Sequence, residues 1–425
     1  MLIWVDEANV KKTGGLIGIT TVNFTPLAAT RATVIGSGFG LMLRDMQVGA
    51  RVIITTVLLT IMAPADAQVF SSSAGDIKVE TVARGLEYPW SLAFLPNNRM
   101  LITERPGRMR IVTRTGGLSA PLAGVPEVVA QGQAGMMDVV IDRDYPRNST
   151  IYFCFNATIN GDVAVARARL IDSDAPRLEA VKVIFRQDKP TTSGGTNNAC
   201  RIAQDADGKL FVTLGDHADM AASAQNLGDT FGKIIRIEPD GSVPPDNPFV
   251  GQPGARGEIW AYGVRNPEGL AFDAEGQLWE QEHGPKGGDE INIIVKGKNY
   301  GWPVIGYGVN YDGAKIHKST RMPGMEQPAW HWTPSIAPSG MTFYSGKLWA
   351  GWRGDLFNGA LKYQLVSRLK RTGNRLVREE RLLQGLQERI RDVREGPDGA
   401  LWLLTDNSAG RLLRVTPRQA KEEGQ

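Results

Sequence analysis

Histidine and cysteine are scarce in this chain of 425 residues, which contains four histidines and two cysteines. The sequence has no His-Glu-x-x-His pair, no Gly-x-Ser-x-Gly turn and no phosphate-binding glycine-rich loop that ends in lysine. Those patterns carry the chemistry of zinc peptidases, serine hydrolases and nucleoside triphosphatases. The sequence therefore gives no support to these three classes of enzyme.

Strong net charge and helical periodicity are also missing. The formal net charge is +3, which is too small to indicate nucleic acid or an acidic membrane surface as a partner. The segment from Val366 to Ile390 has many charged residues, but Gly373 and Gly385 interrupt any helix there. A chain of this length can hold two or three average domains, although β-propellers often run long as single units.

A targeting signal precedes the main part of the chain. Arg51 is followed by the apolar run Val52–Met62 and then by Ala63–Gln68, which offers an Ala-x-Ala cleavage site. This order of charged, apolar and small residues is that of a secretory signal peptide, and the run is shorter than the roughly 20 residues of a spanning helix. We expect residues 42–67 to be removed, which leaves 68–425 in the periplasm or outside the cell. An uncleaved anchor is the alternative.

The residues before the signal lack the pattern of any domain. A signal peptide normally stands at the very start of a chain. We therefore expect residues 1–41 to be a mis-assigned N-terminal extension, with translation starting at Met42 or Met46. After cleavage the protein is expected to have no stable membrane anchor.

The two cysteines are Cys154, in a strand-like run, and Cys200, directly before an arginine. Neither cysteine has the spacing of a Cys-x-x-Cys pair or of a metal site. In an oxidising compartment two cysteines tend to form the one internal disulfide that is available to them. A Cys154–Cys200 disulfide is therefore predicted, with two buried free thiols as the alternative.

A degenerate repeat runs through the chain from about residue 80. Each copy has a short apolar strand, a turn with Asp, Asn or Gly, and a second strand rich in aromatic residues. Asp-Gly between apolar runs favours a β-hairpin because glycine adopts positive φ without strain. The six pairs are Ser91–Phe94 with Met100–Ile102, Met137–Ile141 with Ile151–Phe153, Arg201–Gln204 with Asp207–Val212, Gly269–Phe272 with Glu275–Trp279, Gly340–Phe343 with Ser345–Trp349, and Asp392–Arg394 with Pro397–Trp402. Six copies at a spacing of about 50 to 70 residues predict an all-β fold, a six-bladed β-propeller.

The stretch around which the chain is organised runs from Tyr262 to Trp302. Its Gly284-Pro285 turn and the glycines after it expose backbone carbonyls, and two carboxylates, Asp289 and Glu290, follow closely. Calcium prefers such a mixture of carbonyl and carboxylate oxygens. The stretch therefore indicates a calcium site, with a plain polar loop between two strands as the alternative.

Four cationic side chains indicate an anionic ligand. Arg389 and Arg391 are two positions apart, so on a strand both side chains point to the same side. With Lys362 and Arg265 they could converge on a small ligand with several carboxylates, which guanidinium groups bind through paired hydrogen bonds. The alternative is that they are solvated strand residues with local carboxylate partners.

Four segments of this chain together resemble one known family. They are Gly263–Pro267 (GVRNP), Glu282–Asn292 (EHGPKGGDEIN), Gly297–Pro303 (GKNYGWP) and Arg389–Val393 (RIRDV). They resemble the soluble aldose sugar dehydrogenases that depend on pyrroloquinoline quinone (PQQ), close to soluble quinoprotein glucose dehydrogenase. The resemblance covers roughly residues 78–417. It implies a six-bladed propeller, bound calcium and PQQ, and oxidation of an aldose at the anomeric carbon to a lactone, with electrons passed to an external acceptor.

The resemblance also implies roles for particular residues. Those implied to contact PQQ are Arg265, Asn266, Lys362, Arg389 and Arg391. Those implied to bind calcium are Gly284 and Pro285, through their carbonyls at the active site, and Glu290 and Tyr300, the second through its carbonyl, at a structural site. Near the substrate the implied residues are Gln133 and Asp216, of which Asp216 would orient the catalytic base.

One departure from the family pattern falls on that base. The family has a histidine four residues before an arginine, and here the residue four before Arg201 is Asn197, with Thr196 at the acidic position before it. An amide cannot accept a proton at neutral pH, and general-base catalysis contributes about 10²–10⁴-fold. The departure predicts weak or absent turnover. Otherwise another group such as His217 is the base, or the substrate differs.

Two other classes of function remain open at this point. One is a calcium-dependent propeller lactonase, which needs several side-chain carboxylates and amides around a central ion and has no use for Lys362, Arg389 and Arg391. The other is a propeller that binds sugar or protein without chemistry. PQQ binding in the presence of calcium separates the dehydrogenase from both.

Overall fold

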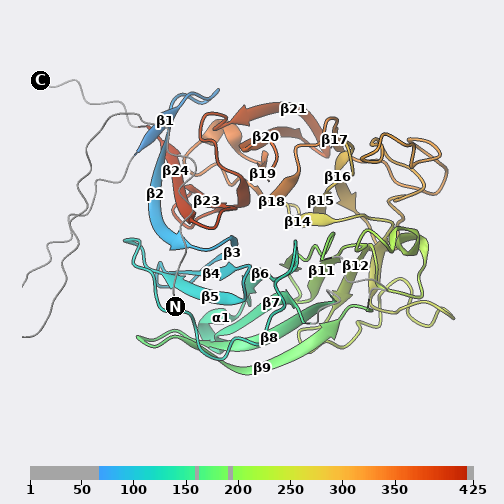
Figure 1. The fold of residues 1–425 in the computed structure, drawn as a ribbon, viewed down its shortest axis with the longest axis horizontal. Helices are drawn as coiled ribbons and strands as arrows, with labels where there is room; N and C mark the ends of the chain where they lie inside the picture. The colour runs from blue at the N-terminus through green and yellow to red at the C-terminus, as the bar shows by residue number, and fades with distance from the viewer. Residues whose placement is uncertain (1–66, 158–161, 190–194, 419–425) are drawn as a thin grey trace, which may run out of the picture. The chain divides into compact units, whose positions relative to one another are not determined.

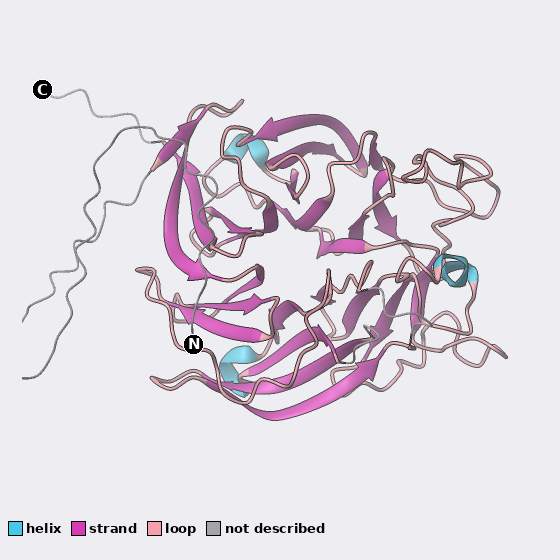
Figure 2. Ribbon diagram, viewed as in Figure 1, coloured by secondary structure: helices cyan, strands magenta, loops and turns pink. Residues whose placement is uncertain are grey.

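The short apolar runs of the repeat fold as antiparallel strands in the computed structural model, which describes residues 67–157, 162–189 and 195–418. Helix is rare among these residues, as Figure 2 shows: one α-helix, α1 (Tyr145–Asn148), and 3₁₀ turns at Ala221–Gln225 and Ala350–Trp352. No helix in the described ranges has the length and hydropathy needed to cross a membrane. The predicted extension and signal peptide lie outside the described residues, apart from Ala67.

The strands of the described residues form six sheets, which are the six predicted blades. The first has β3 (Pro89–Phe94), β4 (Met100–Glu104) and β5 (Arg108–Val112). The second has β6 (Met136–Ile141), β7 (Thr150–Asn156), β8 (Val163–Ile171) and β9 (Arg177–Arg186). The third has β10 (Ile202–Gln204), β11 (Leu210–Leu214), β12 (Lys233–Ile237) and β13 (Ile259–Tyr262). The fourth has β14 (Pro267–Phe272), β15 (Leu278–Glu282), β16 (Asp289–Ile294) and β17 (Trp330–Trp332). The fifth has β18 (Pro338–Phe343), β19 (Leu356–Ala360), β20 (Leu365–Thr372) and β21 (Arg375–Leu382). The sixth joins β22 (Ile390–Glu395), β23 (Leu401–Thr405) and β24 (Gly410–Pro417) to β2 (Ile77–Leu86) and β1 (Gln68–Phe70).

The ring closes by pairing the two ends of the propeller. Strand β2 runs antiparallel to β24, with Val79 opposite Val415, so the blue and red ends of the ribbon lie side by side in Figure 1. The sixth sheet therefore contains strands from both ends of the described chain. This closure removes two exposed sheet edges, which would otherwise be open to pairing with other chains.

Five of the six predicted hairpins form the two innermost strands of a blade. The exception is the pair Gly340–Phe343 with Ser345–Trp349, whose second strand is predicted wrongly. Strand β18 pairs with β19 and not with a strand ending at Trp349. That residue instead precedes the 3₁₀ turn, where its ring stacks on Trp352 with 4.9 Å between ring centroids. In a strand, residues 349 and 352 would lie on opposite faces, so their indoles could not stack. In the 3₁₀ turn the two indoles pack together and bury apolar area against each other.

The hydrophobic core lies between neighbouring blades, because the middle strands are covered on both faces. Strand β7 is buried at every position except its first, which matches an apolar run with no polar alternation. Among the core residues between the second and third blades are Cys154 and Cys200. Their Cα atoms lie 6.4 Å apart and their sulfurs form a disulfide, so the predicted pairing is confirmed. The bond ties β7 to the segment just before β10.

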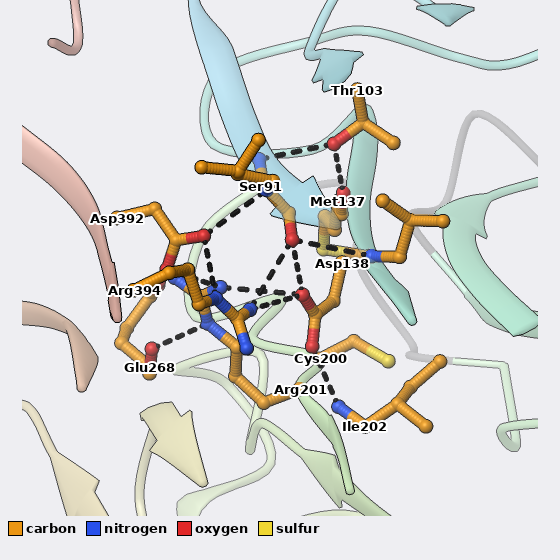
Figure 3. A network of polar contacts seen from close by, with 12 residues as sticks. Ser91, Thr103, Met137, Asp138, Cys200, Arg201, Ile202, Glu268, Asp392 and Arg394 are labelled. Carbon is orange, nitrogen blue, oxygen red and sulfur yellow. Dashed lines mark hydrogen bonds and ion pairs between the residues drawn. The ribbon is translucent and has the colours of Figure 1, made fainter. Parts of the chain in front are cut away.

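The innermost strands are joined by a buried charge network, which Figure 3 shows from close by. Arg201 lies between two carboxylates, 3.3 Å from Asp138 and 3.1 Å from Asp392. Arg394 lies 2.9 Å from each of the same two aspartates. The Arg201 guanidinium also lies over the Trp90 ring, 4.1 Å from its centroid. Two arginines and two aspartates from three blades thus neutralise one another at the centre of the ring.

Arg201→Met is expected to lower the free energy of unfolding by about 3–5 kcal/mol, because it leaves buried carboxylates without a full set of partners. Urea unfolding followed by tryptophan fluorescence measures the change. Arg147→Met is the control, since its 2.5 Å pair with Asp144 is exposed and such pairs contribute about 0–1 kcal/mol. An equal loss in both variants would contradict a structural role for the central network.

Candidate functional site

A central cavity of about 250 Å³ lies where the six innermost strands meet. Each blade contributes to its lining from its first strand or from the residues just before that strand. The six contributors are Trp90, Met137, Ala199, Glu268, Ala337 and Arg391. Loops supply the remaining side chains, which include Arg105, Gln133, His283, Tyr311, Arg389 and Asp406. The cavity is therefore on the propeller axis, where every blade can contribute a side chain.

Arg389 and Arg391 converge in this cavity, as their spacing predicts. Both guanidinium groups donate to Asp406 Oδ2, Arg389 at 2.9 Å and Arg391 at 3.3 Å. Arg391 also donates to Glu268 Oε2 at 3.1 Å, and its Nε atom is buried without a partner. Burial alone would raise the pKa of Asp406, but the nearby arginines outweigh it and lower that pKa. Arg389 and Arg391 therefore have the local carboxylate partners of the alternative, but Arg391 is buried and not solvated.

Asn266 and Glu268 lie two positions apart at the start of β14 and face the same way. The Asn266 amide donates to Glu268 Oε1 at 3.2 Å, and its oxygen accepts the Ala199 N–H at 3.0 Å. Asn266 is fully buried. Its side chain therefore joins the segment before β10 to the Glu268–Arg391 pair at the cavity wall.

Asn197, Asp216 and Gln133 also come together. The Asn197 amide donates to Asp216 Oδ1 at 2.8 Å, and the Asn197 N–H donates to Gln133 Oε1 at 2.8 Å. Trp302 Nε1 donates to the other Asp216 oxygen at 2.8 Å. Burial raises the pKa of Asp216, although Arg265 and Asn197 act in the opposite direction. Asp216 is thus positioned to orient whichever side chain stands at 197, while Thr196 is exposed.

His217, the nearest alternative base in the sequence, points elsewhere. Its Nε2 lies 2.8 Å from Gln187 Oε1, and its ring packs edge-on against Phe231. Burial lowers the pKa of His217 to about 4, against an opposing effect of Asp162. The ring is not part of the central cavity lining. The geometry gives no support to His217 as the base.

A second hollow, the oxygen-rich pocket, gathers all four residues implied to bind calcium: Gly284, Pro285, Glu290 and Tyr300. Arg265 lines it too, with its guanidinium 5.3 Å from the Trp302 ring centroid. Its Nη1 donates to the His283 carbonyl at 3.0 Å. His283 lines both the pocket and the central cavity, so the two hollows are neighbours.

Asp289 holds the Gly284 turn in place and does not point into the pocket as a free ligand. Its carboxylate accepts the Gly284 N–H at 2.8 Å and the Ser335 hydroxyl at 2.7 Å. The Ile336 N–H donates to it at 2.8 Å. A side chain at position 284 would place its Cβ 2.3 Å from the Gly287 carbonyl oxygen, so only glycine fits this turn.

Two buried carboxylates, those of Glu282 and Glu290, line the oxygen-rich pocket, and Glu280 lies close to them in the same sheet. Burial raises the pKa of Glu282 to about 7, against the effect of its hydrogen bond from the Arg265 N–H. Burial raises the pKa of Glu280 and Glu290 well above the ordinary value, and Glu282 adds to both shifts. Within the described ranges no three His, Cys, Asp or Glu side chains form a metal-binding group. A cation here would therefore depend mainly on backbone carbonyl oxygens.

Of the five residues predicted to contact PQQ, only Arg389 and Arg391 line the central cavity. Arg265 lines the oxygen-rich pocket instead, and Asn266 is fully buried behind Glu268.

Lys362 lies farther from the prediction. It follows Leu361, which lines the cavity, but Lys362 itself is exposed. Its ammonium group lies 5.5 Å from the centroid of the neighbouring Tyr363 ring. Its side chain would have to reorient to reach a ligand bound beside Arg391.

Comparison with known proteins adds to this geometry. Residues 86–414 match the family model described as glucose/sorbosone dehydrogenase. The aldose sugar dehydrogenase YliI of Escherichia coli strain K12 is 44% identical over 351 residues, which cover 80% of this chain and 93% of that protein. The chain belongs to the glucose/sorbosone dehydrogenase family. Its members are oxidoreductases, and the predicted resemblance to sugar dehydrogenases is confirmed at the level of the family.

Solved structures of family members agree with the fold. A crystal structure described as glucose dehydrogenase superposes with a TM-score of 0.76 at 47% identity, and covers 80% of this chain and 99% of that chain. The PQQ-bound form of an aldose sugar dehydrogenase from Streptomyces coelicolor superposes with a TM-score of 0.67 at 28% identity, over 83% of this chain and 99% of that one. The six-bladed β-propeller is thereby confirmed.

The sequence analysis did not predict several of the residues that line the central cavity. Glu268 stands two residues after Asn266, so the same period-two argument that paired Arg389 with Arg391 could have found it. Asp406 follows the apolar strand β23 and has only a turn signal, Asp-Asn, to mark it. Arg105 and Trp90 carry no local signal. They lie at the site because the closed ring places the first blade beside β22 of the sixth.

Proposed function

We propose that this dehydrogenase oxidises aldose sugars at the anomeric carbon to lactones, with PQQ and calcium as cofactors and an external electron acceptor. The observation that carries the proposal is the contact between the two hollows. An arginine-lined cavity on the propeller axis shares His283 with a pocket of carbonyl and carboxylate oxygens. A planar polycarboxylate and a hard cation would thus lie next to each other.

The central cavity fits a polar anionic ligand. Arg391 Nε and both polar side-chain atoms of Asn198 are buried without hydrogen-bond partners, and both residues line the cavity. Such groups are costly unless a bound molecule satisfies them. PQQ has three carboxylates, so Arg389 and Arg391 would hold it by charge-assisted hydrogen bonds, with Arg265 and Asn266 beside it.

The oxygen-rich pocket fits a calcium ion. The pocket is lined by Gly284, Pro285, Tyr300 and Glu290, which would offer it backbone carbonyl oxygens and one carboxylate. Three neighbouring carboxyl groups with raised pKa values also favour a cation, because positive charge would let more of them ionise. These donors are those that calcium prefers.

When bound, PQQ supplies a two-electron acceptor and calcium supplies a Lewis acid. The chain's own residues would bind these cofactors and the sugar and orient them. Arg389 and Arg391 fix the ligand, while Asp289 keeps the Gly284 turn rigid. Gln133, whose side-chain oxygen accepts the Asn197 N–H, lines the cavity next to position 197 and would contact the sugar. The sugar hydroxyl must lose a proton during the reaction. In this proposal position 197 is where the family's base would accept that proton.

Asn197 occupies the position of the family's catalytic base in this proposal. Its amide nitrogen donates a hydrogen bond to Asp216. An amide side chain does not accept a proton at neutral pH, so Asn197 would not take one from the sugar. Weak turnover with intact cofactor binding follows. A substrate that needs no base at this position is the second candidate. A lactonase is less well supported, because it gives Arg389 and Arg391 no role.

The proposal is tested by titrating the purified protein with PQQ in excess calcium while following the quinone absorbance. We expect stoichiometric binding that a calcium chelator weakens. Slow oxidation of glucose with an artificial electron acceptor is expected in the same preparation. A protein that leaves the quinone spectrum unchanged at all PQQ concentrations would contradict the proposal.

We also propose that the protein is exported and that its mature form begins near Gln68. The disulfide between Cys154 and Cys200 supports this location, because such bonds persist in oxidising compartments. Mass spectrometry of the periplasmic or secreted fraction is expected to find an N-terminus close to that residue. Secreted protein that still carries Met1 would contradict it.

A further inference from the structure

Arg105 is a cavity arginine without an ion pair. Among the described residues, three arginines line the central cavity, and two of them, Arg389 and Arg391, are bonded to the two lining carboxylates. No carboxylate of the described ranges lies within 4.0 Å of the Arg105 guanidinium. The cavity therefore has an excess of positive charge, and that excess is on Arg105.

The position of Arg105 is fixed from three sides. Its N–H donates to the Tyr88 carbonyl at 3.0 Å, and its own carbonyl accepts the Met136 N–H at 2.9 Å. Its guanidinium lies over the Tyr88 ring, 4.3 Å from the centroid. Gly135 packs so closely that a Cβ there would lie 2.6 Å from Arg105 Cγ. A side chain held this firmly loses little entropy when it binds a ligand.

We infer that Arg105 binds a carboxylate of the ligand in the central cavity. The inference rests on the proposed function for the existence of that ligand. A guanidinium with free N–H groups and one planar face stacked on a tyrosine ring is suited to paired hydrogen bonds with a carboxylate. Its positive charge also reaches Asp406, whose pKa it helps to lower, so it faces the same space as Arg389 and Arg391.

The carboxylate can belong to the cofactor or to an acidic sugar, and both sources share this chemistry. PQQ has three carboxylates, whereas Arg389 and Arg391 can each hold one through paired hydrogen bonds. Arg105 also lies on the side of the cavity formed by the Gln133 loop, since Met136 is bonded to its carbonyl. A uronic acid, an aldose with a carboxylate, would meet it there.

Arg105→Gln and Arg105→Lys test the inference, with Arg84→Gln as the control, because Arg84 is an exposed arginine on β2 outside the cavity lining. Thermal melting checks that each variant is folded. PQQ affinity in excess calcium is measured by quinone absorbance. Binding of D-glucuronate and of D-glucose to each protein, with and without PQQ, is measured by calorimetry.

We expect Arg105→Gln to weaken PQQ binding at least about tenfold, the loss of one charge-assisted hydrogen-bonded pair. Arg105→Lys should recover part of it and Arg84→Gln should change nothing. If PQQ affinity is unchanged but glucuronate binding falls tenfold and glucose binding does not, the carboxylate is that of the sugar and the inference stands. Affinities within twofold of wild type for both PQQ and glucuronate overturn it. If the wild-type protein binds no PQQ, the proposed function is wrong. The inference on Arg105 then stands if Arg105→Gln weakens glucuronate binding tenfold, and it fails if that binding is unchanged.

Discussion

Asn197→His is expected to raise the rate of aldose oxidation on the order of 10²-fold, the usual contribution of a general base. The site is already built for the ring. Asp216 accepts the Asn197 amide at 2.8 Å and is itself held by Trp302, so it can orient an imidazole N–H in the same way. Residue 197 has φ of 49°, a left-handed conformation in which histidine, like asparagine, is enriched. The measurement is steady-state oxidation of glucose with PQQ, calcium and an artificial acceptor.

Two further variants separate a base from a mere change of shape. Asn197→Gln keeps an amide at the position and is expected to give no gain. Adding Asp216→Asn to the histidine variant should remove most of the gain, because the ring then loses its orienting carboxylate. The pH profile of the histidine variant should also gain an acidic limb from the new imidazole. Brisk turnover by the wild type, with no rise in Asn197→His, would mean that another residue is the base.

Arg391→Ala is expected to weaken PQQ binding by at least about 10²-fold. The variant loses a charge-assisted hydrogen bond that contributes about 1.5–3 kcal/mol. It also leaves Glu268 without its 3.1 Å ion pair inside the cavity, so a buried carboxylate would repel the carboxylates of the ligand. Quinone absorbance in excess calcium measures the affinity, and thermal melting confirms that the protein is folded.

Two comparison variants make this result specific. Asn197→Ala should leave PQQ affinity almost unchanged, since residue 197 faces Asp216 and Gln133. Lys362→Ala should have a smaller effect than Arg391→Ala, because Lys362 is exposed beside Tyr363. Equal PQQ affinity for the wild type and for Arg391→Ala would refute the cofactor site.

Local sequence patterns were sufficient for the fold and for the pairing of neighbouring site residues. Five inner hairpins follow from apolar runs joined by turns such as Asp207-Gly208, because strand alternation and positive φ at glycine are properties of a few adjacent residues. The same local logic placed Arg389 and Arg391 on one side of the chain. It failed at Trp349, where packing of two indoles replaced the expected hairpin.

The partners of the site residues were decided only by the tertiary structure. Arg391 is paired with Glu268, 123 positions away, and no periodicity connects residues so distant in sequence. The ring closure brings Arg105 and Trp90 to the same cavity as Asp406, while it leaves Lys362 exposed. The sequence by itself determined which inner strands form and that Arg389 and Arg391 lie on one side of the chain, since both depend on local backbone geometry. Only the closed ring determined which charges are neutralised and which remain free for a ligand, because ion pairing depends on distances between side chains from different blades.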